Sequence, residues 1–372
     1  MLLHQLSLYQ FRNIEQLSTH FADEINIFYG DNAQGKSNIL EAIYLLCTLK
    51  SFRGSRNQEL IRWNQPEGFV QAEVHRREII RDLRVVLSGN RRSVFIDEKR
   101  AKSLDETFGH VHAVLFAPED LAISKGAASI RRTFIDRAVF NAFPGYYNEL
   151  KAYDQALRHR NVLLKRDGGS IPERTILDVF DQQLASLGAR VMARRFSLIE
   201  VFRPIFRDIH RDIAGLSRDA DLYYDPSVQP IGGVEESALE AALLSRLQNE
   251  LRKDVGRGFT SSGPHVDDLV LMLDGRAARS HASQGQHRTL VLALKITEIK
   301  HLHTILGVPP LLLLDDVSSE LDEHRNNQLM EHVVQSAGQV FMTTTDPKSM
   351  RLKGKTVRFC VQAGKLISEL SS

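Results

Sequence analysis

Residues 25–46 read INIFYGDNAQGKSNILEAIYLL, and this stretch decides the fold. Its first five residues are mostly β-branched or aromatic, which predicts a strand. Gly30 to Ser37 then match the pattern G-x-x-x-x-G-K-[ST], a loop whose backbone N–H groups surround phosphate oxygens. Apolar residues recur at helical spacing directly after it. A strand, this loop and a helix in that order predict a nucleoside triphosphate site in an α/β fold.

The residue types of the loop fit that role. Glycine lets the backbone approach a ligand closely and adopt positive φ. Lys36 would reach the β- and γ-phosphates, and the Ser37 hydroxyl would bind Mg²⁺. The predicted nucleotide-binding residues of the loop are Gly30, Asp31, Asn32, Ala33, Gln34, Gly35, Lys36 and Ser37.

A run of four leucines that ends in Asp315 and Asp316 predicts the second half of the site. A buried parallel strand would deliver these carboxylates at its C-terminal end, where open α/β sheets bind ligands. Asp315 would hold Mg²⁺ through the water shell of the ion. Asp316 would polarise the attacking water, so Asp316 and Lys36 are the catalytic candidates.

Ser283, Gln284, Gly285 and Gln286 stand at the start of another predicted helix. A Ser-x-Gly-Gln turn there presents backbone N–H groups and a hydroxyl to an anion. The alternative is a plain helix cap, because serine is a preferred capping residue. The presence of the other two motifs favours the anion.

Composition bounds the class of protein. The chain has 372 residues, 42% hydrophobic and 25% charged, with a net charge of +2. These values are ordinary for a soluble globular protein. Two cysteines, Cys47 and Cys360, give no disulfide framework or metal knuckle, which fits a reducing cytosol. No apolar run is long enough to span a membrane, and the first residues lack a signal-peptide pattern.

The pattern along the chain predicts two domains. Period-2 runs in residues 3–29 and 69–97 predict strands, the latter antiparallel. Residues 128–214 have a helical period and carry 15 Lys and Arg against 10 Asp and Glu, which suggests an anionic partner. No heptad run supports a long coiled coil. We expect an α/β domain over 1–125 plus 235–372 and an inserted helical subdomain over 126–234.

The order of phosphate loop, Ser-x-Gly-Gln, LLLLDD and then Ser318 to Asp322 resembles the ABC-type ATPases. The N-terminal FRN, KSFRG, LFAPEDL, the RRTFID segment from Arg131, SQGQHR and LALK resemble the RecF family of SMC/Rad50-related heads. This resemblance covers essentially the whole chain. It implies an ABC-type ATPase head with an antiparallel β portion and a short helical insertion.

The resemblance also implies how the site works. ATP would be sandwiched between two protomers, with the phosphate loop of one facing Ser283, Gly285 and Gln286 of the other. The family pattern further places Arg12 and Asn13 near the nucleotide, Asp322 in a loop that crosses the dimer, and Gln58 in the Q-loop. The implied function is ATP-dependent DNA binding at gaps or stalled forks, with RecO and RecR, in RecA loading and the SOS response. A bacterial cytoplasmic, nucleoid-associated protein is implied.

Two positions depart from the ABC pattern. Asp316 stands where a longer glutamate is usual, and Thr343 to Asp346 stand where many members have histidine. Both changes predict slow hydrolysis, which suits a timed switch.

Several arginines are candidate contacts to the DNA backbone, which needs cations along one face. No sequence-reading motif accompanies them, so we expect recognition of backbone shape. The alternative is a solvated, salt-bridged surface, since Asp208 and Asp212 are close enough to pair with some of them. The candidates are Arg91, Arg92, Arg131, Arg132, Arg194, Arg195, Arg203 and Arg207.

Three rival functions stay open from the sequence alone. An ATPase subunit of a membrane transporter would need a separate membrane partner. A small-molecule kinase leaves the Ser283 segment unexplained. A clamp of another DNA pathway could bind ATP without useful turnover.

Overall fold

The computed structural model describes all residues except 167–173, 215–217, 231, 317–337, 346–353 and 372. The chain forms two compact units, one of Met1–Asp120 with Lys295–Ser372 and one of Leu121–Leu294. Residues 235–294 therefore pack with the second unit, although the sequence grouped them with the α/β domain. In that unit the helix over 236–249 contacts the long helix over 174–214, and the strand over 268–273 pairs with the strand over 220–225. The predicted division into an ATPase domain over 1–125 plus 235–372 and an inserted helical subdomain over 126–234 stays a prediction.

The first unit contains a six-stranded sheet in the order β2-β1-β4-β5-β6-β7, with every neighbouring pair antiparallel. Side chains along β4 alternate between buried and partly exposed, as a sheet covered on one face requires. The strands are β1 (Leu2–Phe11), β2 (Ile14–His20), β4 (Glu67–Arg76), β5 (Ile79–Ser88), β6 (Arg91–Ile96) and β7 (Lys99–Arg100).

The second sheet of this unit has the order β15-β14-β3-β13-β12-β8 and is parallel except for β15. The residues of β8, β12 and β13 are all buried, so the apolar run at 311–314 is a central strand. The strands are β3 (Ile25–Tyr29), β8 (Ala113–Phe116), β12 (Leu311–Leu314), β13 (Val340–Thr344), β14 (Thr356–Gln362) and β15 (Lys365–Ser371).

Helix α1 (Lys36–Thr48) contacts strands of both sheets, and nearly all of its side chains are buried. It follows β3 directly, so burial of its apolar face fixes the position of the loop between them. The other short helical segments in this unit are α2 (Asn57–Leu60), α3 (Leu104–Thr107) and the 3₁₀ turn η1 (Pro118–Leu121), which the boundary between the units crosses.

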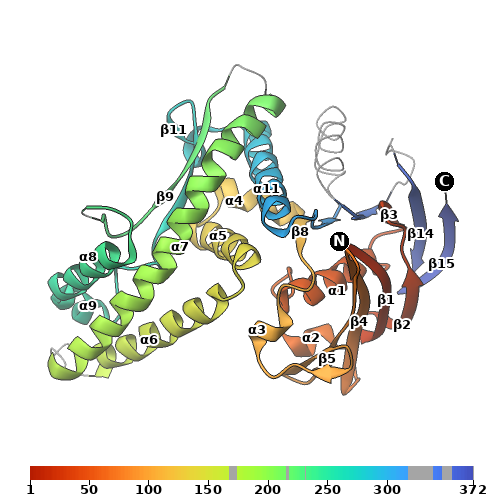
Figure 1. Cartoon of the computed structure of the whole chain (residues 1–372), viewed down its shortest axis with the longest axis horizontal. Coiled ribbons are helices and arrows are strands. Elements are labelled where there is room, and N and C mark those ends of the chain that lie inside the picture. Colours follow the sequence, from red (N-terminus) through yellow and green to blue (C-terminus); the bar gives the residue numbers. More distant parts are fainter. Residues whose placement is uncertain (167–173, 215–217, 231, 317–337, 346–353, 372) are drawn as a thin grey trace. The chain divides into compact units, whose positions relative to one another are not determined.

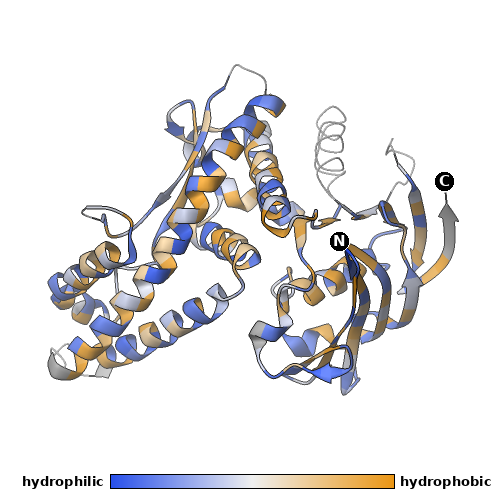
Figure 2. Ribbon diagram, in the orientation of Figure 1, coloured by the Kyte–Doolittle hydropathy of each residue, from blue (hydrophilic) through white to orange (hydrophobic). Residues whose placement is uncertain are grey.

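The second unit is mainly helical and contains one small sheet, β11-β10-β9. Figure 2 shows hydrophobic and hydrophilic residues alternating turn by turn along α7, which packs against α6, α8 and β9. Its elements are α4 (Ala122–Lys125), α5 (Ala128–Ala142), α6 (Tyr146–Arg166), α7 (Arg174–Ala214), β9 (Ala220–Asp225), α8 (Glu236–Asn249), α9 (Leu251–Arg257), β10 (Asp268–Leu273), β11 (Arg276–Ala277) and α10 (Ala278–His281). Helix α11 (Gln284–Leu306) begins in this unit and ends in the first.

A buried charge cluster ties three of these helices together. Arg160 on α6 is fully buried and donates to Asp181 on α7 at 2.6 Å and to Asp254 on α9 at 2.8 Å. Removing one member would leave an uncompensated buried charge, so the cluster fixes how the helices pack.

The structure differs from the expected elements in two places. A proline such as Pro204 is expected to kink a helix or to start a new one, but α7 continues past it as a single helix. Strands β9, β14 and β15 were not predicted. No helix in the described part of the chain is long and apolar enough to cross a membrane.

Candidate nucleotide-binding site

The phosphate loop joins β3 to α1, as the sequence predicts, and two of its positions disfavour any residue with a side chain. Gly30 has φ +143° and Gly35 has φ +112°. A Cβ atom on Gly30 would lie 2.4 Å from the carbonyl oxygen of Val361, and one on Gly35 would lie 2.8 Å from Oδ1 of Asn13. The loop therefore keeps its backbone at the N-terminus of α1, where N–H groups and the helix dipole favour an anion.

Lys36 lies within this loop and is nearly buried. Its Nζ atom donates to the carbonyl oxygens of Gly30 at 2.6 Å and Asp31 at 2.7 Å. Burial lowers the pKa of Lys36, and attraction from the carboxylates of Asp316, Asp31 and Asp315 partly offsets that shift. The Lys36 ammonium is therefore attracted by the acidic pair that follows β12, and β13 lies between β12 and the strand that leads into the loop.

Asp315 and Asp316 follow β12 at the carboxyl edge of the parallel sheet. Asp315 is 7% exposed, and its N–H donates to the carbonyl oxygen of Phe116 at 2.8 Å. The Thr343 hydroxyl on β13 donates to Oδ1 of Asp315 at 2.9 Å and accepts from the N–H of Asp316 at 2.9 Å. One threonine therefore orients the Asp315 carboxylate and the Asp316 backbone, which has φ +47°.

The donor set suits Mg²⁺. Mg²⁺ prefers hard oxygen ligands and is commonly held by one or two protein ligands together with substrate phosphates. Ser37 and Asp315 supply oxygens of this kind at the two ends of the site. Within the described ranges, no group of three His, Cys, Asp or Glu side chains could hold a metal by itself.

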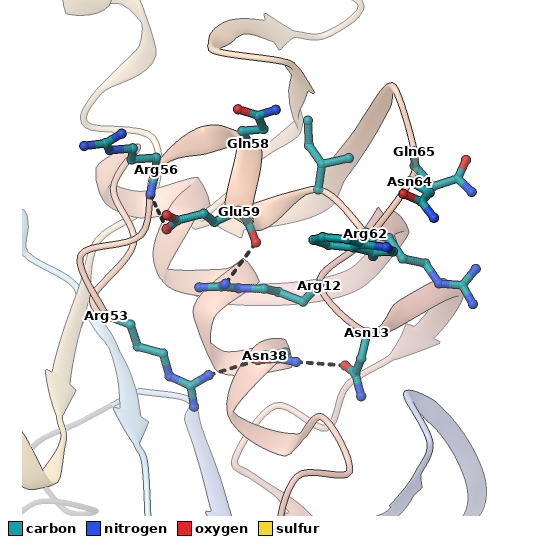
Figure 3. A pocket seen from close by; sticks show the side chains of 12 residues that line it. Arg12, Asn13, Asn38, Arg53, Arg56, Gln58, Glu59, Arg62, Asn64 and Gln65 are labelled. Carbon is teal, nitrogen blue, oxygen red and sulfur yellow. Dashed lines mark hydrogen bonds between the residues drawn. The ribbon is translucent and has the colours of Figure 1, made fainter.

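A chain of side-chain hydrogen bonds connects the loop to the residues around it (Figure 3). Asn13 accepts from Asn38 at 2.8 Å, and Arg53 donates to Asn38 at 3.0 Å. Asn13 also donates to the carbonyl oxygen of Gln34 in the loop at 3.1 Å. The Arg53 guanidinium also lies 3.9 Å from Oδ2 of Asp315. The sequence analysis missed Asn38 and Arg53 as site residues, although KSFRG contains Arg53.

Arg12 belongs to the same neighbourhood but has a structural partner. Its guanidinium makes two 2.8 Å hydrogen bonds to the fully buried Glu41 of α1 and one of 2.6 Å to Ser55. A further bond of 2.9 Å reaches the carbonyl oxygen of Glu59. Its predicted contact with nucleotide stays a prediction.

These residues border a pocket of about 810 Å³. Arg12, Asn13, Asn38 and Arg53 line it, and so does the exposed Gln58, the predicted Q-loop residue. The volume falls in the range of pockets that bind small molecules.

The C-terminal hairpin also holds the loop. In the turn between β14 and β15, Ala363 donates its N–H to Oε1 of Gln34 at 2.7 Å, and Gly364 donates its N–H to the carbonyl oxygen of Gln34 at 2.8 Å. No local sequence pattern indicates this contact, because neither strand was predicted.

The Ser-x-Gly-Gln segment lies in the second unit, at the start of α11. The Ser283 hydroxyl accepts from the N–H of Gln286 at 3.3 Å, and the N–H of Ser283 donates to the Gln286 side chain at 2.7 Å. This reciprocal pair is a capping box, so the capping alternative describes the geometry. Gly285 lies in the first turn, where Thr289 donates to its carbonyl oxygen at 3.1 Å. An anion contact in a second protomer stays a prediction, and Asp322 and Asp346 lie outside the described residues.

Two of the eight arginine candidates are not available to DNA. Arg131 is 4% exposed and makes two 2.7 Å bonds to Asp268. Arg195 is 1% exposed and bonds to Asp136 at 2.8 Å. Both predictions are corrected, because these guanidinium groups are buried and paired with carboxylates. A run of basic residues in the sequence does not show which of its side chains are buried.

The other six remain candidates at the surface or partly exposed. Arg91 is exposed at the start of β6, and Arg92 bonds to Asn57. Arg132 donates to the carbonyl oxygen of Asp267 at 2.8 Å. Arg194 pairs with Glu149 at 3.3 Å and stacks over Phe143.

Arg203 and Arg207, both exposed on α7, share the carboxylate of Asp221 on β9. The sequence analysis had considered Asp208 and Asp212 as partners, because β9 was not predicted. The pair of arginines keeps a net positive charge.

Comparison with known proteins identifies the family of the chain. The family model of the RecF/RecN/SMC N-terminal domain matches residues 2–368. The DNA replication and repair protein RecF of Myxococcus xanthus is 42% identical over 353 residues, which are 94% of this chain and 92% of that protein. The protein of the same name from Anaeromyxobacter sp. is 42% identical over 378 residues and covers 100% of both chains.

Two solved structures are similar over nearly the whole chain. The recombination mediator protein RecF-ATPrS in the RecFOR pathway has a TM-score of 0.90 at 31% identity, covering 98% of this chain and 97% of that one. The RecF-ATP structure has a TM-score of 0.87 at 30% identity, covering 99% of each. These likenesses confirm the predicted ATPase-head fold class. The chain belongs to the RecF family, within the RecF/RecN/SMC N-terminal domain group.

Proposed function

We propose that this protein is an ATP-dependent DNA-binding protein of recombinational repair and replication, with slow ATP hydrolysis as its switch. The observation that carries the proposal is the joint geometry of Lys36, Asp315 and Thr343. A phosphate loop that requires glycine at Gly30 and Gly35 occurs in the same unit as Thr343, whose hydroxyl holds the Asp315 carboxylate and the Asp316 backbone N–H. Relatives with ATP and RecFOR in their descriptions support the choice of ATP and of the pathway.

The residues divide the work of the site. The loop N–H groups and Lys36 bind the phosphates, Ser37 and Asp315 hold Mg²⁺, and Asp316 accepts a hydrogen bond from the attacking water. The bound Mg²⁺ supplies charge neutralisation on the phosphates. Asp316 is one methylene shorter than glutamate, so its carboxylate reaches the water less closely and turnover is slow.

A second protomer completes the proposed switch. Ser283, Gly285 and Gln286 of one copy contact the γ-phosphate on the loop of the other, so ATP joins two copies head to tail. Hydrolysis removes this bridging charge and releases the pair. Such a dimer closes on duplex DNA or on junctions with single strands, and it works with RecO and RecR in RecA loading and the SOS response, in the bacterial cytoplasm at the nucleoid.

ATPase assays with and without DNA test this function. We expect slow basal turnover that duplex DNA stimulates, no ATP binding in Lys36→Ala, and ATP binding without turnover in Asp316→Asn. The transporter alternative predicts no response to DNA. Fast turnover without DNA, or normal turnover in Asp316→Asn, would contradict the proposed switch.

A further inference from the structure

Trp63 is the only tryptophan of the chain and is 86% exposed. A tryptophan is highly buried on average, so such exposure needs an explanation. The segment that carries it is firmly anchored. The N–H of Arg62 donates to the carbonyl oxygen of Gln10 at 2.9 Å, and the N–H of Arg12 donates to the carbonyl oxygen of Leu60 at 2.8 Å. The indole is therefore exposed by a fixed backbone and not by a loose end.

The local turn explains how the indole is presented. The N–H of Gln65 donates to the carbonyl oxygen of Arg62 at 3.1 Å, which closes a four-residue turn with Trp63 at its second position. Asn64 at the third position has φ +62°. A type II turn requires a positive φ at that position, and asparagine tolerates it well. The turn thus holds Trp63 at its corner.

Trp63 lines the 810 Å³ pocket whose other wall contains Asn13, Asn38 and Arg53. Those three side chains form the hydrogen-bond chain that reaches the phosphate loop at Gln34. Asn38 follows Ser37 directly in α1. The pocket of the exposed indole is therefore lined by residues that adjoin the phosphate loop, and all of them belong to the first unit.

We propose that Trp63 is the base-binding residue of the site and stacks on the purine of the nucleotide whose phosphates the loop binds. This inference rests on the proposed ATP binding. An indole face stacks on the π-face of a base, and a purine offers more stacking area than a pyrimidine. Within the described part of the chain, the amides of Gln58, Asn64 and Gln65 have no hydrogen-bond partner, so they can bind the polar edge of the base.

The pocket favours the base of a bound nucleotide over a base of a DNA strand. A DNA strand needs further cationic positions along its backbone. Here Arg12 and Arg62 in the pocket wall are already paired, with Glu41 at 2.8 Å and Glu15 at 3.0 Å, which leaves Arg56 as a single exposed cation beside Arg53. Arg53 donates a hydrogen bond to Asn38, which directly follows the last loop residue, Ser37. This side of the pocket is therefore close to the expected position of a triphosphate.

Because the chain has a single tryptophan, its fluorescence emission reports directly on Trp63. We would titrate the full-length protein with ATP, UTP and inorganic tripolyphosphate, and follow both calorimetric binding and tryptophan emission. We expect ATP to quench Trp63 and to bind more tightly than UTP. Trp63→Ala should weaken ATP binding about tenfold and leave tripolyphosphate binding unchanged. Trp63→Phe should restore most of the affinity, and Ile80→Ala, an exposed apolar residue of β5, should match the wild type.

The outcomes separate this inference from the proposed function. If ATP binds in a Lys36-dependent way but Trp63 emission and the affinity of Trp63→Ala do not change, the stacking inference is wrong and ATP binding stands. If no nucleotide binds by calorimetry, both fail. If a single-stranded oligonucleotide quenches Trp63 and ATP does not, the indole contacts DNA and the inference is again overturned. A thermal melt of Trp63→Ala should match the wild type, because the side chain is exposed.

Discussion

Thr343 is the residue on which the acidic half of the site depends. Its buried hydroxyl bridges the side chain of Asp315 and the backbone of Asp316. Partners that orient metal ligands commonly affect metal affinity or activity 10- to 100-fold when removed. The hydroxyl at the end of β13 is therefore as important for the geometry of the expected Mg²⁺ site as the two aspartates.

Replacing Thr343 with valine keeps its shape and removes the hydroxyl. We expect turnover and apparent Mg²⁺ affinity to fall about 10- to 100-fold, while ATP binding measured without Mg²⁺ stays unchanged. Thr343→Ser retains the bridging oxygen and should keep most of the activity. Wild-type Mg²⁺ dependence in Thr343→Val would show that the bridge does not position Asp315.

Substitution of Arg12, a residue of the FRN motif, tests whether its side chain contacts the nucleotide or stabilises the fold. Arg12→Ala leaves the fully buried Glu41 carboxylate without its bidentate partner. We expect a loss of about 3 kcal/mol in the free energy of unfolding, measured with urea. The double variant Arg12→Ala with Glu41→Gln should regain part of that loss. Unchanged stability with weakened ATP binding would instead assign Arg12 to the nucleotide.

Much of the site could be predicted at this scale because its chemistry is local in sequence. Gly30 to Ser37 and the pair Asp315–Asp316 each lie within a few consecutive residues. Thr343, Asn38 and Arg53 act through contacts that join distant segments, and their residue types are common in other roles. Arg131 and Arg195 were misassigned for the same reason, since their partners Asp268 and Asp136 are distant in sequence.

At the scale of elements, strand β9 supplies the partner of two exposed arginines on α7. Its Asp221 accepts hydrogen bonds from both Arg203 and Arg207. Burial alone would raise the pKa of Asp221, but these hydrogen bonds outweigh it and hold the pKa well below its ordinary value. The carboxylate therefore stays ionised at neutral pH. Any stability that the pair contributes is present above the ordinary pKa of aspartate and is lost only as the pH falls through the lowered one.

Asp221→Asn tests whether this stretch of α7 contacts DNA. The change removes one negative charge beside two exposed guanidiniums, so we expect tighter DNA binding and a salt dependence steeper by about one unit. Arg203→Ala should have the opposite effect. Asp212→Asn, on an exposed part of the same helix, is the matched control. Equal affinities of the Asp221 and Arg203 variants across salt concentrations would exclude this face.

Elements with a clear period were predicted well, and those without one were missed. The alternation in β4 and β5 and the apolar run of β12 carry their own signal. Strand β9 reads ADLYYD and β14 reads TVRFCVQ, and each is short and interrupted by polar residues. Such strands form because a neighbour supplies hydrogen bonds, which a local pattern does not show.

For the whole molecule, the central prediction is that ATP joins two copies. Sedimentation of the protein with ATP should show dimers that are absent without nucleotide. Ser283→Arg places a bulky cation at the start of α11 and should abolish the dimer while ATP binding by the isolated protomer persists. Gln284→Ala, one position along, is the control. Dimers that form equally without ATP would contradict a nucleotide-bridged interface.

The turn between β14 and β15 has a consequence for folding during synthesis on the ribosome. Ala363 and Gly364 hydrogen-bond to Gln34 of the phosphate loop, and the ribosome adds them more than three hundred residues later. A nascent chain still lacking that hairpin cannot close its phosphate cradle. Competence for nucleotide should therefore arise only after the residues of this hairpin have been synthesised, so a shorter nascent chain would not bind ATP.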